Sequence, residues 1–233
     1  MNIALLGYGK MGKAIENIAI KRGHQIVLKA SRDTKDYSLE NIDVAIDFSL
    51  PSSAFENISN CIQQHTPVIS GTTGWLEKYD DIVSQCNQNK GTFLYASNFS
   101  LGVNIFFEVN KTLAKLMKGL PEYKANIEEI HHTQKLDAPS GTAITLAEAI
   151  IKQSDYKNWT LDTPKPKEIG ILAKRIENVS GTHEINYESE VDCISIKHTA
   201  HSREGFALGA VIAAEWIHDK TGVYTMKDVL NIG

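Results

Sequence analysis

The sequence predicts an α/β fold in which an N-terminal Rossmann-type, doubly wound parallel sheet is followed by a smaller α+β domain with a mixed sheet. In the first hundred or so residues, short apolar strands alternate with helical stretches, which is typical of a parallel sheet with helices on both faces. The glycine-rich segment Gly7-Tyr8-Gly9-Lys10-Met11-Gly12 separates the first strand from the first helix. Beyond Gly102, strands follow one another without helices between them, which indicates an antiparallel or mixed sheet.

The first domain is expected to contain five strands, each ending at the same edge of the sheet. Apolar runs predict these strands at residues 3–6, 25–30, 43–48, 67–70 and 92–96. The first helix places its apolar residues on one face, at Met11, Ile15, Ile18 and Ala19. Because right-handed crossovers bring the loops after parallel strands to one edge, ligands are expected there, at loops 7–12, 49–52, 71–74 and 97–100.

The second domain is expected to begin with a long helix and to continue as a sheet. The helix is predicted at residues 103–117, and strands at 123–130, 168–176, 183–188 and 191–199. Residues 156–167 are expected to form a loop, since they contain Pro164 and Pro166. The last predicted helix, residues 206–218, is apolar enough to return to the first domain. We therefore expect a dinucleotide-binding domain at 1–102, completed by 205–233, and a second domain at 103–204.

The composition excludes several classes of function. The chain has 233 residues, of which 42% are hydrophobic and 22% charged, as in ordinary globular proteins. A net charge of −4 leaves no basic block for phosphates, so nucleic-acid binding is not expected. No apolar run is long enough to cross a membrane, and the N-terminus reads as a strand and not as a signal peptide. Three widely spaced cysteines suit reduced thiols, so a cytoplasmic location is expected.

The glycine-rich turn has the spacing of a dinucleotide-binding fingerprint, Gly7-x-Gly9-x-x-Gly12. Its glycines allow a tight turn and a close approach of the backbone to a pyrophosphate, which the helix N-terminus would face. The alternative is a turn that only packs a helix on a strand. Because the turn follows the first strand of an alternating series, nucleotide binding is the favoured interpretation.

The end of the second strand indicates which nicotinamide nucleotide is bound. The segment reads Lys29-Ala30-Ser31-Arg32-Asp33. Ser31 and Arg32 would suit the 2′-phosphate of NADPH, whereas Asp33 could bind the ribose hydroxyl of NADH. NADPH is therefore favoured over NADH. The alternative is that Arg32 is only a solvated surface charge.

A second group of polar residues lies between the strand 123–130 and the next helix. His131, His132 and Lys135 supply positive charge and transferable protons within a few residues. Ser140 has the identity of a helix N-cap, and the helix that follows leaves its first amides, at Gly141 and Thr142, without intrahelical partners. These features predict a site for a carboxylate-bearing substrate. The alternative is a capped helix beside a solvated His-Lys loop, since both are common.

A long motif at residues 129–143, EIHHTQKLDAPSGTA, resembles that of the bacterial 4-hydroxy-tetrahydrodipicolinate reductases, also called dihydrodipicolinate reductases. Shorter matches occur in family order at residues 46–49, 71–74, 96–100 and 198–203, so the resemblance extends from residue 3 to about residue 217. It implies an NAD(P)H-dependent reductase of lysine and diaminopimelate biosynthesis. The implied reaction converts 4-hydroxy-tetrahydrodipicolinate, through its dehydrated form, to tetrahydrodipicolinate.

The resemblance also implies roles for individual residues. His131 would be the proton donor, and Lys135 a second donor or a carboxylate anchor. The substrate, a dicarboxylate, would contact His132, Ser140, Gly141, Thr142, Thr73 and Arg203. The nucleotide would contact Gly7, Tyr8, Gly9, Lys10, Met11, Gly12, Ser31, Arg32, Phe48, Gly71, Thr72, Thr73, Ala96, Ser97, Asn98 and Phe99.

Two features depart from the family pattern. The glycine turn is one residue shorter than the common form, which loosens the phosphate contacts assigned to Tyr8 and Lys10. At residues 175–179, Glu-Asn replaces a pair of glycines and leaves the role of Arg175 open.

The resemblance implies a homotetramer that assembles through the second domain, and the strand pattern agrees with such an assembly. In the last strand, Val191, Cys193 and Ser195 alternate with Ile194 and Ile196. The predicted helices can cover only one face of this sheet. An open face with apolar residues is expected to be buried against a second subunit.

Three other classes of protein were considered. The first is a different Rossmann-type NAD(P)-dependent reductase of amino-acid metabolism, but a semialdehyde dehydrogenase would need a nucleophilic cysteine. Cys61 and Cys86 lie in expected helices and Cys193 in a strand, so none fits. The second is a metal enzyme, but the chain has no HExxH or CxxC motif and no metal is expected. The third is a non-catalytic NADP sensor, which would not need the His-Lys loop.

Overall fold

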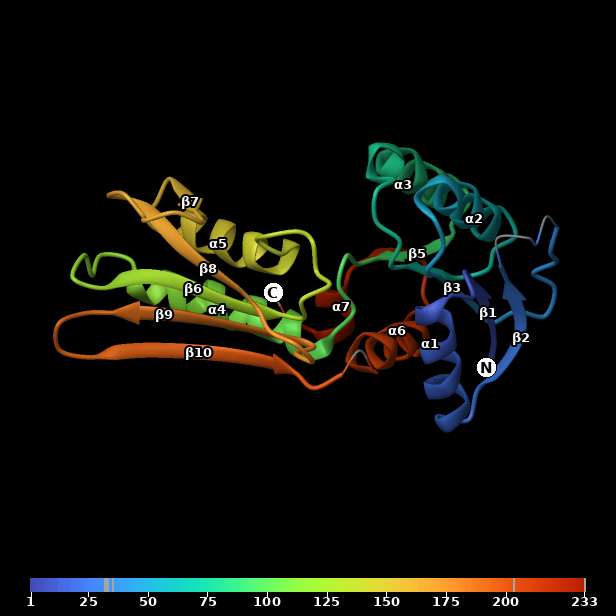
Figure 1. Cartoon of the computed structure of the whole chain (residues 1–233). Coiled ribbons are helices and arrows are strands. Elements are labelled where there is room, and N and C mark those ends of the chain that lie inside the picture. Colours follow the sequence, from blue (N-terminus) through green and yellow to red (C-terminus); the bar gives the residue numbers. More distant parts are fainter. Residues whose placement is uncertain (32–33, 35, 203, 233) are drawn as a thin grey trace. The chain divides into compact units, whose positions relative to one another are not determined.

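A six-stranded parallel sheet with the order β11-β5-β4-β3-β1-β2 forms the centre of the first unit of the chain (Figure 1). The computed structural model describes residues 1–31, 34, 36–202 and 204–232. It divides the chain into one unit of residues 1–104 and 204–233 and a second of residues 105–203. The strands of the first sheet are β1 (Asn2–Leu6), β2 (Gln25–Ala30), β3 (Val44–Asp47), β4 (Val68–Ser70), β5 (Thr92–Tyr95) and β11 (Gly222–Tyr224).

Helices cover both faces of this sheet, as the alternating pattern predicted. Helices α1 (Lys10–Lys21) and α6 (Glu204–Ile217) lie on one face, and α2 (Pro51–Gln63) and α3 (Tyr79–Gln88) on the other (Figure 1). A short 3-10 turn, η1 (Leu76–Lys78), precedes α3, and α7 (Met226–Leu230) ends the chain. The predicted return of the C-terminal helix to this unit is confirmed, since α6 packs against α1.

Helix α6 lies directly on the backbone that follows β5. A Cβ atom placed on Gly209 would stand 1.7 Å from the carbonyl oxygen of Phe99, so only glycine allows this approach. Phe99 is itself buried in the same core, between the sheet and α6. The C-terminal segment therefore supports the loop after β5 from behind.

The second unit is built on a five-stranded mixed sheet with the order β10-β9-β6-β8-β7. Strand β9 runs antiparallel to β6 and β10, whereas β8 runs parallel to β6 and β7. The strands are β6 (Lys124–His131), β7 (Asn158–Thr160), β8 (Glu168–Arg175), β9 (Gly181–Glu188) and β10 (Cys193–Ala200). With both sheets in place, the predicted fold class is confirmed.

Two helices cover one face of the mixed sheet. Alternate side chains of β6 and β8, such as Ile127 and Ile171, pack with apolar residues of α4 (Leu101–Met117) and α5 (Gly141–Gln153) (Figure 1). The other face is more polar than expected. Leu172 is 55% exposed there, but beside it Lys174 pairs with Glu128 at 2.6 Å, and Lys197 pairs with Glu184 at 3.0 Å.

The structure differs from the expected elements at three short segments. Residues 156–167, expected to be a loop, contain β7, which extends the mixed sheet beyond β8. Strand β11 and helix α7 follow the last predicted helix and were not expected. Each has only three to five residues, too few to show a periodic pattern. Among the described helices, none is both long and apolar enough to cross a membrane.

Candidate active site

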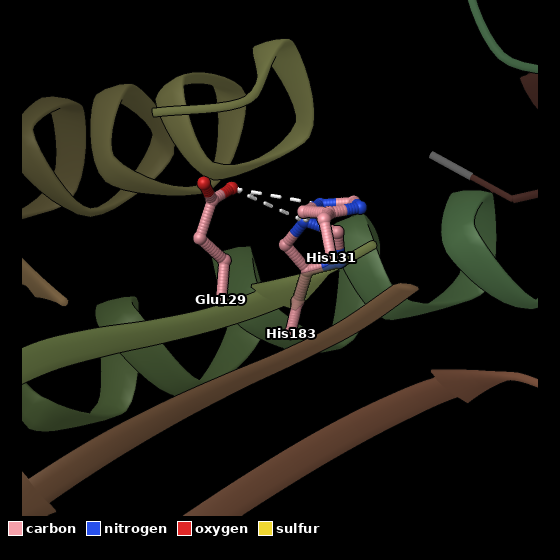
Figure 2. Close-up of side chains that lie close together, drawn as sticks. All are labelled: Glu129, His131 and His183. Carbon is pink, nitrogen blue, oxygen red and sulfur yellow. Dashed lines mark hydrogen bonds and ion pairs between the residues drawn. The ribbon is translucent and has the colours of Figure 1, made fainter. Parts of the chain in front are cut away.

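The end of β6 carries the centre of the candidate site in the second unit. Because side chains alternate along a strand, Glu129 and His131 point to the same face of the sheet, toward α5. In the neighbouring strand β9, His183 stands directly opposite Glu129. Figure 2 shows the Glu129 carboxylate facing both imidazole rings. Glu129 Oε2 lies 3.7 Å from His131 Nε2 and 3.8 Å from His183 Nε2, and the two ring nitrogens are 3.3 Å apart.

Glu129 is fully buried, and its carboxylate organises the residues around it. Oε2 accepts a hydrogen bond from the Ser140 amide at 2.9 Å, and Oε1 accepts one from Arg175 Nη2 at 3.1 Å. Burial alone would raise the pKa of Glu129, but the hydrogen bonds from Ser140 and Arg175 outweigh it and lower the pKa below its usual value. The site therefore contains a buried, ionised carboxylate that joins β6, β8 and the start of α5.

The two histidines share a site that disfavours their charged forms. Burial and, after it, the nearby His131 lower the pKa of His183 to about 4. Burial also lowers the pKa of His131, although the charge of Glu129 works in the opposite direction. Both rings are thus uncharged near neutral pH in the second unit taken by itself.

Ser140 caps helix α5, as its identity predicted. Its Oγ accepts a hydrogen bond from the Ala143 amide at 3.2 Å, and the same Oγ lies 3.1 Å from His183 Nε2. The next two residues, Gly141 and Thr142, begin the helix, where amides have no intrahelical partners. Gly141 is exposed and Thr142 half-buried, so this N-terminus is open to an anion.

Arg175 fastens the loop between β6 and α5. Besides Glu129, its guanidinium donates hydrogen bonds to the backbone carbonyls of Asp137 at 2.6 Å and Lys135 at 3.3 Å. Lys135 Nζ pairs with the exposed Asp137 carboxylate at 2.7 Å, which holds the pKa of that carboxyl below its usual range. The role that the sequence left open for Arg175 is thus to hold the loop that carries Lys135.

His132 follows β6, and the structure leaves part of its ring without a partner. Its Nδ1 is buried and has no hydrogen-bond partner in the described part of the chain. Buried polar atoms are seldom left unpaired in folded proteins. The described residues of the second unit therefore leave this nitrogen without the partner that a buried polar atom normally has.

The first unit brings most of the predicted nucleotide residues to one edge of its sheet. Gly7 has φ +104°, and a Cβ atom there would stand 2.1 Å from the Phe48 carbonyl oxygen, so the turn requires glycine. Phe48 contacts Gly71 and lies 5.6 Å from the Phe99 ring. Gly7, Tyr8 and Gly9 precede α1, whose first turn contains Lys10, Met11 and Gly12; Ser31 follows β2; Gly71, Thr72 and Thr73 follow β4; Ala96, Ser97, Asn98 and Phe99 follow β5.

Helix α1 has the free N-terminus that a pyrophosphate site needs. Its N-cap is Gly9, and no side chain caps it. Its first amides are therefore available to an anion, and the bare backbone of the turn allows a close approach. The residues of this loop fit a dinucleotide on these grounds.

A cationic group near this loop was missed by the sequence analysis. Lys29, near the end of β2, pairs with Glu16 at 2.5 Å and lies 5.0 Å from the centre of the Tyr8 ring. The Tyr8 hydroxyl also donates a hydrogen bond to Glu16. The basic residue in the segment Lys29-Ala30-Ser31 was the available signal. Arg32 and Asp33, from the same segment, and Arg203 lie outside the described residues.

One group of side chains within the described residues has the donor types of a metal site. The ligand atoms of Glu129, His131 and His183 lie within 4.8 Å of one another. Zinc takes such ligands. However, Glu129 already accepts hydrogen bonds from Ser140 and from the Arg175 guanidinium, whose positive charge would repel a cation. These contacts favour a hydrogen-bonded proton-transfer group over a metal centre.

A parallel sheet with an open glycine turn and a separate mixed sheet with a histidine-lysine loop together define a two-unit oxidoreductase of the nicotinamide-dependent kind. Family models described as the N-terminus and C-terminus of dihydrodipicolinate reductase match residues 1–99 and 102–230. The chain belongs to the dihydrodipicolinate reductase family, which confirms the resemblance seen in its motifs.

Individual relatives agree with this assignment. A 4-hydroxy-tetrahydrodipicolinate reductase of Christiangramia forsetii is 58% identical over 99% of this chain and 98% of its own. The enzyme of that name from Alkaliphilus oremlandii is 36% identical over 100% of this chain and 99% of its own. The solved structure of a dipicolinate-bound dihydrodipicolinate reductase from Paenisporosarcina sp. TG-14 has the same fold, with a TM-score of 0.79, 21% identity and 97% of both chains covered.

Proposed function

We propose that this protein reduces 4-hydroxy-tetrahydrodipicolinate, through its dehydrated form, to tetrahydrodipicolinate in lysine and diaminopimelate biosynthesis. The observation that carries the proposal is the full-length match to a reductase of that name, at 58% identity. The match includes the first unit, with its open glycine turn, and the second, with its histidine-lysine loop. A non-catalytic sensor would need only the first of these.

The second unit provides the groups that such a reaction requires. The nucleotide, when bound, supplies a hydride to an imine-conjugated ring, and the negative charge that results must be neutralised by an acid. His131 is the proposed proton donor. Lys135 is the proposed carboxylate anchor or second donor. The remaining proposed substrate contacts are His132, Ser140, Gly141, Thr142, Thr73 and Arg203.

Support for substrate binding comes from groups left without partners. The amides that begin α5 are open to an anion, and the buried Nδ1 of His132 lacks a hydrogen-bond acceptor or donor from the described residues. A dicarboxylate would satisfy both, with Lys135 adding positive charge.

NADPH is the proposed preferred nucleotide, with NADH as the second. Ser31 and Arg32 would read the 2′-phosphate. The other proposed nucleotide contacts are Gly7, Tyr8, Gly9, Lys10, Met11, Gly12, Phe48, Gly71, Thr72, Thr73, Ala96, Ser97, Asn98 and Phe99.

The proposed assembly is a cytoplasmic homotetramer formed through the mixed sheet. The face of that sheet opposite α4 and α5 carries ion pairs and the exposed Leu172. Glu128 and Glu184 stand opposite each other on β6 and β9, with Lys174 and Lys197 on the strands outside them, so acids of one subunit can meet bases of another about a two-fold axis.

An assay of nucleotide oxidation tests the function. Purified protein is mixed with NADPH and with substrate generated in situ, and absorbance of the reduced nucleotide is followed. Substrate-dependent oxidation is expected, and it should be lost when the substrate-generating enzyme is omitted. Binding of NADPH without any turnover would instead identify a nucleotide sensor.

A further inference from the structure

The two edges of the His131 ring have different surroundings. On one edge, Nε2 lies 3.3 Å from His183 Nε2 and 3.7 Å from Glu129 Oε2 (Figure 2). On the other edge, the nearest part of β9 is Gly181, which has no side chain. A Cβ atom there would stand 3.3 Å from His131 Nδ1 and 3.2 Å from Cε1. The Nε2 edge is therefore occupied by polar partners, whereas residue 181 adds no side chain at the Nδ1 edge.

The hydrogen bonds of Ser140 decide what His183 can accept. Ser140 Oγ already accepts a hydrogen bond from the Ala143 amide, so its hydroxyl hydrogen must be donated elsewhere. His183 Nε2 lies 3.1 Å from Ser140 Oγ, within hydrogen-bond distance, and receives this hydrogen. His183 Nε2 is therefore an acceptor, so His183 carries its own hydrogen on Nδ1, and this acceptor faces His131 Nε2 at 3.3 Å.

The charge of Glu129 fixes which nitrogen of His131 carries the hydrogen. A neutral imidazole has one N–H and one lone pair, and the lone pair is repelled by a nearby anion. His131 Nε2 faces both the carboxylate, at 3.7 Å, and the acceptor nitrogen of His183, so the hydrogen is placed on Nε2. Nδ1 is left as the free basic nitrogen.

We propose that Glu129 and His183 are positioning residues that hold His131 through its Nε2–H, so that Nδ1 is the nitrogen that takes up and delivers the proton. The proposal rests on the proposed function for the role of His131 as proton donor. When hydride adds to the substrate, the N–H bond at Nδ1 breaks, and the proton forms a bond to the substrate atom that holds the new electron pair. The neutral ring then regains a proton from water.

Glu129 has a second effect, on the charged form of His131. The described groups that act on this ring are Glu129, Lys135, Arg175, His132 and His183, and His198 faces His183 from β10. Of these, only the Glu129 carboxylate favours the imidazolium; the cations and burial oppose it. The carboxylate thus stabilises the cation of His131, as the aspartate of a serine-protease triad does for its histidine.

A direct measurement of the tautomers tests the placement of the hydrogen. The full-length protein is labelled with ¹⁵N, and two-bond ¹H–¹⁵N correlations of the histidine rings are recorded at about pH 8, above the usual histidine pKa. His131→Gln identifies the signals of residue 131. We expect the Nε2–H tautomer for His131 and the Nδ1–H tautomer for His183. The Nδ1–H tautomer at His131 would overturn the proposal, whatever the activity of the protein.

Steady-state kinetics test the positioning role. Glu129→Gln should lower kcat by roughly 10- to 100-fold and leave KM for NADPH nearly unchanged. In a plot of kcat against pH, the alkaline limb should move to lower pH, because the imidazolium of His131 loses the carboxylate that stabilises it. Glu129→Asp, which keeps the charge, should restore that limb. Glu148→Gln, on the exposed side of α5, is the matched control and should behave as wild type. A purely structural role would reduce kcat in Glu129→Gln without moving the limb, and would overturn the proposal.

A failure of the proposed function would give kinetic results different from those of a failure of the positioning role. Normal turnover by His131→Gln would reject His131 as the proton donor, and with it the proposed use of Nδ1. Slow turnover by His131→Gln with an unchanged pH limb in Glu129→Gln would leave the function standing and reject the positioning role.

Discussion

The Thr72 hydroxyl donates a hydrogen bond to the buried carboxylate of Asp47 at 2.8 Å, and so ties the loop after β4 to the end of β3. Ser70 Oγ donates to the same oxygen at 2.8 Å, and Asn57 Nδ2 donates to the other oxygen at 3.1 Å. Burial raises the pKa of Asp47, which these hydrogen bonds partly oppose. The carboxylate is the common acceptor at the edge where the nucleotide loops meet.

Replacing this carboxylate by an amide is expected to weaken the first unit. Ser70, Thr72 and Asn57 all donate hydrogen bonds to the native side chain. In Asp47→Asn, the side-chain NH2 group would therefore face a hydrogen-bond donor in place of an acceptor. We expect a loss of about 1–3 kcal/mol in the free energy of unfolding, measured with urea. Asp43→Asn, at an exposed position before β3, is a control that should lose much less. An unchanged midpoint for Asp47→Asn would show that the donors find other partners.

Alanine at either proposed catalytic position should slow turnover without loss of the nucleotide. His131→Ala and Lys135→Ala are each expected to reduce kcat by roughly 10²–10⁴-fold, as for the loss of a general acid or of a charged anchor. NADPH affinity, measured by fluorescence, should be retained, since neither residue lies in a nucleotide loop. Lys152→Ala, on the exposed surface of α5, should retain full activity. Near-normal turnover in both variants would contradict the assignment.

The choice of nucleotide is expected to depend on Arg32. Arg32→Ala should weaken NADPH binding by about 1–3 kcal/mol, the range for hydrogen bonds to charged groups, and should hardly change NADH affinity. Titration calorimetry with both nucleotides measures the difference. Equal losses for the two nucleotides would mean that Arg32 does not read the 2′-phosphate.

Stability should fall on mild acidification because of His183. Its pKa is lowered from 6.5 to about 4 in the folded protein, so the unfolded chain binds a proton first as the pH falls. The stabilisation is therefore complete above pH 6.5 and is lost between 6.5 and about 4, by up to about 3 kcal/mol. Urea unfolding at several pH values measures this loss. Glutamine does not titrate, so the free energy of unfolding of His183→Gln should depend less on pH over the same range.

The mixed sheet is expected to form the contacts between subunits. Light scattering at micromolar concentration should give about four times the monomer mass of 25.8 kDa. Reversing the charge of Lys174, which pairs with Glu128 on the open face, should shift the assembly toward smaller species. A fully active monomer would rule out the proposed assembly.

Periodicity predicted most of the fold because the long elements each bury one face. Strand β2 and the burial of Ile15 and Ala19 in α1 agree with the expectation from sequence. The short β7 and β11 were missed, since each owes its strand conformation to pairing with a neighbour, β8 or β5, and not to its own three residues.

The candidate site was predicted where it is continuous in sequence and missed where it depends on strand register. The motif at residues 129–143 pointed to His131, Lys135 and the cap at Ser140. Nothing local indicates that His183 stands opposite Glu129, or that Arg175 stands beside His131. Those neighbours are set by the pairing of β6 with β9 and β8, which a single sequence does not reveal.

The contact between Gly209 and Phe99 has a consequence for synthesis of the chain. Residues 1–104 leave the ribosome first, yet α6 and β11, which complete their core and sheet edge, come after the entire second unit. Until about the last thirty residues emerge, the nascent first unit exposes the apolar surface that α6 will cover. The order of translation therefore favours early folding of residues 105–203 and delays completion of the first unit until α6 and β11 have emerged.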